Sequence, residues 1–441
     1  MQGEDGLTAT DNHHAGLPQP SELVPLLRWV HPACGLTVLS EPSTVLGRDS
    51  ALTTRLAGDQ VSRRHAAVVC VNGSLEVRDL GSKNGSFVNG RRIERCALAD
   101  GDVVRLGDCV GIVERVPAGG LPGFAELARG LYGGAAMRAV AERAKRAASG
   151  SLNVVLQGET GTGKERFANA LHSWSGRSGA FVAVNCANYT SDTAQAELFG
   201  YRKGAFTGAE RANVGHVRAA NRGTLLLDEV LDLPLEVQAK LLRVLEQREV
   251  LALGETTPVP VDVLFLAASQ RPLGHAVAAG TFRADLHARL EGIVVEIPPL
   301  RARRSDVIPL FVELLKRHGF RTLPQMEATL VERLCLEPWP LNVRQLENVA
   351  RRAAALYAAA PVLRAAHFRE LMPEAVPTAD DAEEEALLPP RRAVASYTAE
   401  EVQALRAALA RHKDNLTQAA IELGITRGKA YRMLRSSTLP E

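Results

Sequence analysis

The feature that most constrains this chain is the glycine-rich segment 158–165, with the sequence GETGTGKE. It follows the apolar run 153–157 and precedes a segment with a helical pattern, which is the strand, loop and helix order of a phosphate-binding loop. Glycines let backbone N–H groups approach phosphates, the helix N-terminus adds positive charge, and Lys164 is expected on the β- and γ-phosphates. The predicted nucleotide-binding residues are Gly158, Glu159, Thr160, Gly161, Thr162, Gly163, Lys164 and Glu165.

A second apolar run, 224–228, ends in the acidic pair Asp228 and Glu229. Asp228 is expected to hold Mg²⁺, directly or through water, and Glu229 to polarise an attacking water molecule. Glu165 occupies the position at which the general motif has Ser or Thr, so a hydroxyl ligand for Mg²⁺ is missing there. An acid pair alone is compatible with a capped strand end, but beside the glycine-rich loop it indicates a nucleoside triphosphatase that uses Mg²⁺.

Composition excludes several classes of protein. The net charge is +2, from 52 Lys and Arg against 50 Asp and Glu, so any nucleic-acid surface must be local. No apolar run approaches the roughly 20 residues that span a bilayer, and the polar first residues lack an apolar signal core. The 6 cysteines are scattered without CxxC spacing, which argues against a disulfide framework or zinc site and favours a cytoplasmic location.

The pattern of apolar runs changes along the chain and predicts a multidomain protein. Short strands with turn signals over 24–115 indicate an all-β sandwich, whereas strands at 153–157, 181–185, 224–228 and 261–267 alternate with helices and indicate a parallel α/β sheet. Residues 305–372 have an almost wholly helical pattern. We expect a disordered N-terminus (1–22), a sandwich (23–115), a linker (116–130), an α/β core (131–300), a helical lid (301–373), an acidic, proline-containing linker (374–396) and an all-α unit (397–441).

Three short segments of the sandwich fall at expected strand ends: Gly47-Arg48, 62–65 and 81–86. Arginine and serine side chains there are suited to a phosphate dianion, and an asparagine to a peptide backbone. Each segment taken alone favours the plainer interpretation of a hairpin turn with solvated arginines. Their order and spacing over roughly 40–112 resemble the forkhead-associated domain. That resemblance implies phosphothreonine binding by Arg48, Ser62, Arg63, Ser82 and Asn84, with His65 bracing the loop.

The last unit has three helical segments, and Gly424 separates the second from the third. A helix, a glycine-containing turn and a basic helix are typical of a helix-turn-helix, although a solvated basic helix is the alternative. Residues 415–426 resemble the Fis-type DNA-binding module. The expected DNA-binding residues are Thr426, Arg427, Lys429, Arg432 and Arg435.

The segment GAFTGA at 204–209 is the most specific motif of the chain. Its physical properties alone indicate a glycine-bounded loop with an exposed aromatic residue, which is suited to a contact site. Its sequence resembles the sigma-54-contacting loop of bacterial enhancer-binding proteins, which are ring-forming AAA+ ATPases, and the resemblance extends over 131–372. It implies a sigma-54 contact through Gly204, Ala205, Phe206, Thr207, Gly208 and Ala209.

The same resemblance implies roles at other positions. Asn185 matches the residue that couples the catalytic glutamate to the nucleotide state, and Arg344 matches a sensor that contacts the phosphates in cis. Arg283 and Arg289 match arginines that reach the γ-phosphate of a neighbouring subunit, although surface arginines are the plain alternative.

Four positions depart from the family pattern: Gln270 stands for the asparagine of its Thr-Asn sensor, Leu341 for a glycine, Arg218 for an acid and Arg222 for a glycine. We expect these departures to affect the rate of ATP hydrolysis and its coupling to the sigma-54-contacting loop, rather than the presence of ATPase activity.

The resemblance implies a cytoplasmic activator that hydrolyses ATP in a ring, a hexamer or heptamer, and remodels closed sigma-54 polymerase complexes into open ones. Its partners would be sigma-54 RNA polymerase holoenzyme, enhancer DNA, and a phosphothreonine protein such as a Ser/Thr kinase or its substrate. Whether the sandwich activates or represses stays open at this stage. The alternative is a regulator that binds phosphopeptides and DNA and has a weak or inactive ATPase.

Overall fold

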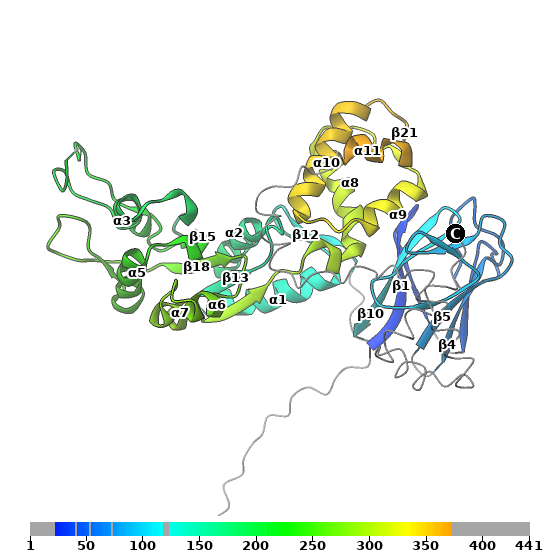
Figure 1. Ribbon diagram of the computed structural model, residues 1–441, viewed down its shortest axis with the longest axis horizontal. Coiled ribbons are helices and arrows are strands. Elements are labelled where there is room, and N and C mark those ends of the chain that lie inside the picture. Colours follow the sequence, from blue (N-terminus) through cyan, green and yellow to red (C-terminus); the bar gives the residue numbers. More distant parts are fainter. Residues whose placement is uncertain are drawn as a thin grey trace, which may run out of the picture. The chain divides into compact units, whose positions relative to one another are not determined.

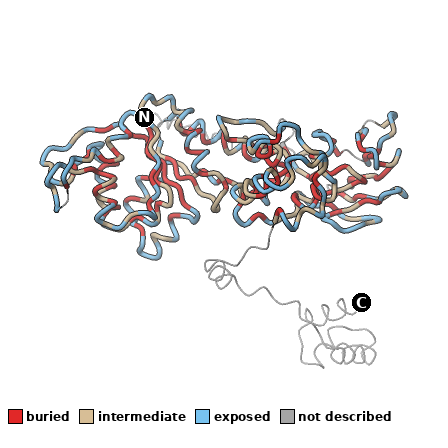
Figure 2. Tube along the Cα trace, turned by 90° about the horizontal axis from the view of Figure 1, so that it is seen from above, coloured by how far each residue is buried: buried red, intermediate tan, exposed pale blue. Residues whose placement is uncertain are grey.

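The structure is a computed structural model that describes residues 23–39, 42–52, 54–71, 74–117, 123–150, 152–207 and 209–372. The N-terminal 1–22, the predicted linker 374–396 and the helix-turn-helix unit with Thr426, Arg427, Lys429, Arg432 and Arg435 lie outside the described residues. Buried positions follow the strands and the inward sides of the helices (Figure 2). Within the described ranges, no helix is both long and apolar enough to cross a membrane.

The first part of the described chain is the expected β-sandwich, made of a six-stranded and a four-stranded sheet. Alternating residues of both sheets form one apolar core, in which Trp29, Val77 and Leu106 are buried. The six-stranded sheet has the order β2 (Gly35–Val38), β1 (Leu23–His31), β10 (Cys109–Pro117), β9 (Val103–Leu106), β6 (Ser86–Val88) and β7 (Arg91–Ile93). The four-stranded sheet has the order β3 (Ser43–Leu46), β4 (Ala66–Val71), β5 (Ser74–Asp79) and β8 (Arg95–Leu98).

The next part is a parallel α/β sheet, as the alternation of strands and helices predicted (Figure 1). Its order is β14 (Phe181–Asn185), β15 (Thr224–Asp228), β18 (Leu264–Ser269), β13 (Val154–Gln157) and β19 (Ile293–Glu296). The predicted strand 261–267 has the wrong bounds: β18 begins at Leu264 and ends at Ser269, and the residues just before 261 form β17 (Val259–Pro260), which pairs with β16 (Glu249–Val250).

Helices cover both faces of this sheet, because its strands are apolar on both sides. On one face pack α1 (Ala135–Ser149) and α2 (Lys164–Ser175), against Val154, Leu156 and Leu266. The other face is covered by α3 (Ser191–Phe199), α4 (His216–Ala219), α5 (Leu235–Gln247), α6 (Leu273–Ala278) and α7 (Ala284–Leu290). Short 3-10 turns follow β14 at Cys186–Asn188 (η1) and β15 at Val230–Asp232 (η2).

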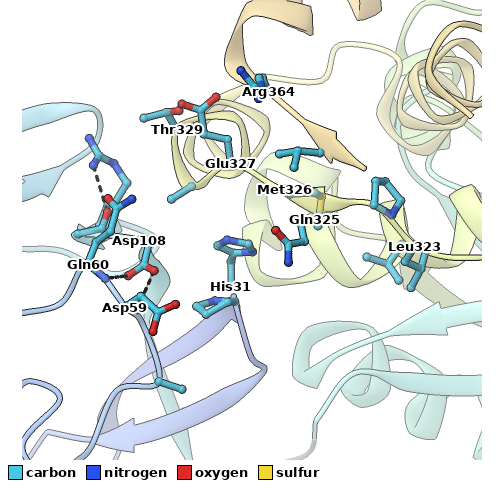
Figure 3. A pocket seen from close by; sticks show the side chains of 18 residues that line it. His31, Asp59, Gln60, Asp108, Leu323, Gln325, Met326, Glu327, Thr329 and Arg364 are labelled. Atoms are coloured by element: carbon cyan, nitrogen blue, oxygen red, sulfur yellow. Dashed lines mark hydrogen bonds between the residues drawn. The ribbon is translucent and has the colours of Figure 1, made fainter. Parts of the chain in front are cut away.

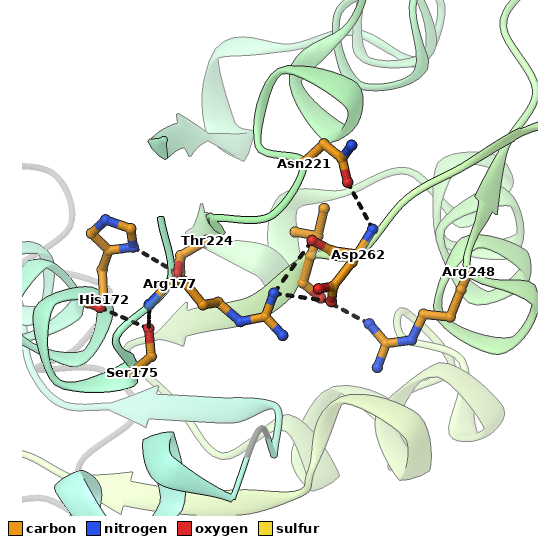
Figure 4. Close-up of polar contacts among 8 residues, drawn as sticks. His172, Ser175, Arg177, Asn221, Thr224, Arg248 and Asp262 are labelled. Carbon is orange, nitrogen blue, oxygen red and sulfur yellow. Dashed lines mark hydrogen bonds and ion pairs between the residues drawn. The ribbon is translucent and has the colours of Figure 1, made fainter. Parts of the chain in front are cut away.

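Polar contacts hold the amino ends of the core strands (Figure 4). Arg177 donates to the Asp262 carboxylate at 3.0 Å, and the Asp262 amide donates to the Asn221 side chain at 2.9 Å. The ring of His172 lies 2.9 Å from the hydroxyl of Thr224, the first residue of β15. These contacts fix where β15 and β18 enter the sheet, and therefore where their carboxyl ends leave it.

The lid is helical, as expected, with α8 (Val307–Arg317), α9 (Ala328–Leu336), α10 (Asn342–Tyr357) and α11 (Phe368–Leu371). The turns η3 (Leu300–Ala302) and η4 (Arg304–Asp306) precede α8, and η5 (Ala365–His367) precedes α11. The prediction of helix misses one parallel pair, β20 (Gln325–Met326) with β21 (Val362–Leu363). The segment expected as a linker, 116–130, contains β11 (Ala125–Ala128), which pairs with β12 (Leu131–Gly133).

The lid packs against the outer face of the six-stranded sheet, and both belong to one unit that ends at Met372. Its apolar cluster includes four sandwich residues, Val30, Val103, Val110 and Ile112. At this contact Arg105 donates to the carboxylate of Glu332 in α9 at 2.7 Å, with side chains 11% and 7% exposed. The guanidinium of Arg105 also lies 3.6 Å from the ring centre of Phe87.

Beside this contact is a cavity of about 860 Å³ lined by both modules (Figure 3). Asp59, Gln60 and Asp108 line it from the sandwich, and Gln325 and Glu327 from the lid. The sandwich and the lid therefore meet through an apolar patch and a buried ion pair, with a polar cavity next to them.

We expect Glu332→Ala to destabilise the protein by about 3 kcal/mol, because it removes one partner of a buried ion pair and leaves the Arg105 charge behind. Thermal or urea unfolding of the full chain measures this. The matched control is Glu313→Ala, whose partner Lys316 is 49% exposed and whose loss should cost less than about 1 kcal/mol. Equal effects of the two substitutions would contradict this account of the interface.

Candidate functional site

The glycine-rich loop joins strand β13, which lies between β18 and β19, to helix α2, as the sequence indicated. Gly161 and Gly163 have φ values of +74° and +102°, and a Cβ at Gly161 would lie 2.2 Å from the Leu341 carbonyl. The loop is closed by Thr162, whose hydroxyl donates to the Glu159 carbonyl at 2.8 Å. The first residue of α2 is Lys164, so the loop delivers the helix N-terminus and this lysine together.

Lys164 is buried, and its ammonium donates to the Gly158 carbonyl at 2.8 Å. Burial lowers its pKa, whereas Glu229 and Asp228 raise it. The two acids that the sequence placed at the end of β15 are thus close enough to act on this lysine electrostatically. Asp228 is the last residue of β15, and its carboxylate accepts from the Glu229 amide at 3.1 Å.

A cavity of about 400 Å³ is lined by most of the predicted nucleotide-binding residues, but not by Gly158, Glu159 or Thr162. It is lined by the loop and by residues that lie far from it in sequence: Asn185, Asp228, Glu229, Gln270, Val343, Arg344 and Glu347. The carboxyl ends of three adjacent strands and the start of the lid helix α10 therefore meet at one site. This arrangement is the usual place for a ligand in an open α/β sheet.

The lid holds the loop through polar contacts that sequence patterns did not reveal. Arg301 donates to both oxygens of the Glu159 carboxylate, at 2.6 and 2.5 Å, and hydrogen bonds from this arginine lower the pKa of Glu159. Asn342, fully buried with φ +49°, accepts from the Leu300 amide at 2.7 Å and donates to the Thr160 carbonyl at 3.0 Å. Glu159 was predicted among the nucleotide-binding residues, but its side chain is bound to the lid.

The two amides expected to act as switch or sensor are placed differently. Asn185, the last residue of β14, accepts a hydrogen bond from the Ala187 amide at 3.0 Å. Gln270, directly after β18, donates to one carboxylate oxygen of Glu229 at 2.8 Å. Both side chains line the nucleotide cavity, but the bonded partner of Glu229 is Gln270.

The predicted arginines occupy three positions. Arg344 lines the nucleotide cavity, near enough to Lys164 to lower the pKa of that lysine. Arg283 is exposed and forms two hydrogen bonds to Asp285, at 2.7 and 3.0 Å. Arg289 is exposed near the end of α7. Exposed arginines in and next to α7 are compatible with contacts to a neighbouring subunit.

The donor set at the cavity fits Mg²⁺ bound together with nucleotide phosphates. Mg²⁺ is usually held by one or two carboxylates plus phosphate oxygens, and Asp228 and Glu229 supply carboxylates there. Among the described residues, three or more His, Cys, Asp or Glu side chains do not gather anywhere as a metal site. At the loop position where the general motif has a hydroxyl ligand for Mg²⁺, this chain has the exposed Glu165.

The loop 204–209 is a tight turn with an exposed tip. The Gly204 amide donates to the Ala209 carbonyl at 2.9 Å, and Phe206 is 47% exposed with its ring 5.0 Å from that of Tyr201. Thr207 is exposed, while Gly208 lies outside the described residues. The base of the loop is held in place because Tyr201 forms isolated β-bridges with Asn213 and Leu253.

The candidate phosphopeptide site lies at one end of the sandwich. The Arg48 amide donates to the Ser62 carbonyl at 3.1 Å, and the Ser62 hydroxyl accepts from the Lys83 amide at 3.1 Å. Asn84 is exposed and donates to the Gln60 carbonyl at 2.7 Å. These contacts bring together the loops that carry Arg48, Ser62 and Asn84, and the side chains of Arg48 and Arg63 are exposed.

His65 and Ser82 form hydrogen bonds within the loops of this candidate site. Buried His65 lies between the Ser62 amide and the Gly85 carbonyl, both 3.1 Å away, and burial lowers its pKa. This geometry requires the neutral ring with a proton on Nε2, and it gives His65 the bracing position that was expected. Ser82 donates to Asp79 at 2.6 Å and accepts from the Gly85 amide at 3.0 Å, so its hydroxyl already holds the turn.

Comparison with protein families gives three matches. Residues 44–107 match the FHA domain, residues 132–296 the Sigma-54 interaction domain, and residues 301–385 the AAA+ ATPase lid domain.

Individual relatives agree with these matches. The probable regulatory protein HrpS of the Pseudomonas syringae pv. syringae pathogenicity locus is 36% identical over 292 residues, which are 65% of this chain and 90% of HrpS. The sigma-54-dependent transcriptional activator SfnR of Pseudomonas putida is 45% identical over 206 residues, 46% of this chain, and the chain spans little more than half (56%) of SfnR.

Among solved structures, NtrX from Brucella abortus in complex with ADP is 30% identical with a TM-score of 0.50, over 69% of this chain and 68% of NtrX. HrpS is matched over nearly its whole length, and the family matches cover the sandwich, the core and the lid in order. The chain therefore belongs to the family of sigma-54-dependent transcriptional activators with an AAA+ ATPase domain, and it carries a forkhead-associated domain before that ATPase domain.

Proposed function

We propose that this protein hydrolyses ATP in a ring assembly and uses the energy to remodel closed sigma-54 polymerase complexes into open ones. The observation that carries the proposal is the convergence of Lys164, Asp228, Glu229 and Arg344 on one cavity, together with an exposed Phe206 and Thr207 at a separate loop. A binding module without hydrolysis does not require two acids beside a phosphate-binding lysine.

Each group at the cavity has a role in this proposal. Lys164 and Arg344 neutralise phosphate charge, and Asp228 holds Mg²⁺, which shields the phosphates. Glu229 polarises the attacking water. Arg283 and Arg289 act in the neighbouring subunit of a hexamer, and Arg283 must then leave Asp285 to do so.

The path from the cavity to the sigma-54 loop is short in sequence. Asn185 ends β14 at the cavity, and the chain then forms η1 and α3 before it reaches Tyr201 at the base of the loop. A change at the carboxyl end of β14 is therefore transmitted through one helix. We propose that this movement presents Phe206 and Thr207 to sigma-54.

The sandwich would regulate this activity by recognising phosphothreonine through Arg48, Ser62, Arg63 and Asn84. Support comes from the continuity of the structure, because Asn84 leads through Gly85 into β6, and β6 pairs with β9, which carries Arg105. Arg105 in turn binds Glu332 of the lid. A phosphopeptide at Asn84 is thus two strands away from the lid contact.

The C-terminal unit 397–441 completes the proposal as an enhancer-binding module, with Thr426, Arg427, Lys429, Arg432 and Arg435 on DNA. Residues 374–396 then connect this unit to the ATPase. The domain division 23–115, 131–300 and 301–373 and the cytoplasmic location are proposed in the same way.

Open-complex formation tests the central proposal. We expect the full chain with ATP and sigma-54 holoenzyme to open a sigma-54 promoter, and Thr207→Ala to lower open-complex yield at least about tenfold while ATPase activity is retained. The reason is that Thr207 is exposed and outside the nucleotide cavity. Permanganate footprinting measures the yield.

Two further variants make this result interpretable. Lys164→Ala should lose both ATP turnover and promoter opening, whereas Thr322→Ala, which changes another exposed threonine, in the lid, should lose neither. Promoter opening by Thr207→Ala at the parental level would refute the loop assignment. A folded parent chain that binds phosphopeptide and DNA without ATP turnover would favour the alternative regulator.

Phosphothreonine recognition is tested separately by peptide binding. Arg48→Ala should weaken binding of a phosphothreonine peptide by about 10- to 100-fold, because it removes a charge-assisted hydrogen bond to the phosphate, which contributes about 1.5–3 kcal/mol. Fluorescence anisotropy with the phosphorylated and unphosphorylated forms of one peptide measures this. Arg64→Ala, an exposed neighbour, is the matched control, and unchanged affinity in Arg48→Ala would remove this residue from the site.

A further inference from the structure

Two side-chain amides lie on opposite sides of the strand that delivers the catalytic glutamate. In the sheet order, β15 lies between β14, which ends at Asn185, and β18, which Gln270 directly follows. Glu229, the residue after β15, is therefore flanked by one amide on each neighbouring strand. Family resemblance gives the coupling role to Asn185, but the contacts of this chain point to the other amide.

The backbone of Glu229 fixes where its side chain begins. Its φ and ψ are +50° and +52°, a left-handed conformation that is uncommon for a residue with a Cβ. The Glu229 amide donates to Asp228 at 3.1 Å, and its carbonyl accepts from the Asp232 amide at 3.0 Å. With the backbone held at both groups, the remaining freedom is rotation of the side chain.

Gln270 restrains that rotation. Its Nε2 donates to Oε1 of Glu229 at 2.8 Å, a charge-assisted geometry. Asn185 makes a different contact, because its Oδ1 accepts from the Ala187 amide at 3.0 Å and caps the turn η1. The carbonyl oxygen of Asn185 is therefore bound within its own loop.

Gln270 is itself well placed to hold another group. The preceding Ser269 is fully buried, its hydroxyl donates to the Arg271 carbonyl at 2.6 Å, and its carbonyl accepts from the Gly158 amide at 3.1 Å. The backbone of Ser269, directly before Gln270, is thus bound to the phosphate-binding loop. An asparagine here would be shorter by one carbon–carbon bond, about 1.5 Å, which is the difference between a 2.8 Å hydrogen bond and no contact.

We infer that Gln270 is the positioning residue for Glu229 in this chain, and that it takes over from Asn185 the control of the catalytic carboxylate. The inference rests on the proposed ATP hydrolysis. By binding one oxygen of Glu229, Gln270 fixes the plane of the carboxylate and leaves the other oxygen for the attacking water. Because the contact is exposed, its contribution is to orientation, and it adds little to the stability of the fold.

Steady-state ATPase kinetics of the full chain test this inference. Gln270→Ala should lower kcat by about 10- to 100-fold with KM for ATP changed less than about threefold, because a displaced catalytic group slows turnover without loss of binding. Gln270→Asn should not restore kcat, since it is too short to reach Glu229. The matched control is Gln247→Ala, an exposed glutamine at the end of α5, which should leave kcat and KM unchanged.

A double-mutant cycle separates positioning from a direct effect on the nucleotide. In a Glu229→Ala background, Gln270→Ala should cause no further loss of kcat, whereas Asn185→Ala should lower kcat by the same factor in both backgrounds. Coupling of Asn185 rather than Gln270 to Glu229 would overturn the inference, as would an equal loss from Gln270→Ala in both backgrounds.

Failure of the proposed function gives a different result. In that case the parent chain binds no ATP, or it shows no turnover that depends on Lys164. A parent that turns ATP over, with kcat unaffected by Gln270→Ala, instead retains the proposed function and refutes the role of Gln270.

Discussion

The parallel pairing of five strands is the constraint on which the rest of the structure depends. Because the strands run in the same direction and in close register, their carboxyl ends reach one edge, where Gln157 pairs with Ser269 and Asn185 with Asp228. The phosphate-binding loop, the acid pair and Gln270 each follow one of these ends. A shift of one residue in β15 would turn the side chain of Asp228 to the other face of the sheet, so the chemistry of the site depends on the polar contacts that fix the amino ends of the strands.

The lid adds a second constraint, since it contacts the loop through the buried side chain of Asn342 and through the exposed side chain of Arg301. Asn342 satisfies the Leu300 amide of the lid and the Thr160 carbonyl of the loop at the same time, and Arg301 binds the Glu159 carboxylate. Buried polar groups need their partners, so a movement of the lid away from the loop breaks several hydrogen bonds together. Loop conformation and lid position are therefore linked, and a ligand that changes one changes the other.

Sequence patterns predicted what is local and missed what joins distant segments. The strands Phe181–Asn185 and Thr224–Asp228 and the helix from Ala135 follow from apolar periodicity and were found at the expected positions. The contacts of Glu159 with Arg301 and of Arg105 with Glu332 join residues 142 and 227 positions apart, and no periodic signal reports such pairs. Motif matching also assigned a role to Asn185 by position, whereas the amide that is hydrogen-bonded to Glu229 in the structure is that of Gln270.

The contact between sandwich and lid combines two interactions with different consequences. The apolar patch stabilises the contact without directional preference, whereas the Arg105–Glu332 pair requires a defined orientation of α9 against β9. On the lid side, Glu332 and Leu334 lie in the same helix, and the Leu334 carbonyl accepts from the buried indole of Trp339 at 3.0 Å, just before Asn342. An altered orientation of α9 therefore displaces the segment that holds the phosphate-binding loop. Such a connection needs no change in the nucleotide residues themselves, and it is the physical route that the proposed regulation by the sandwich requires.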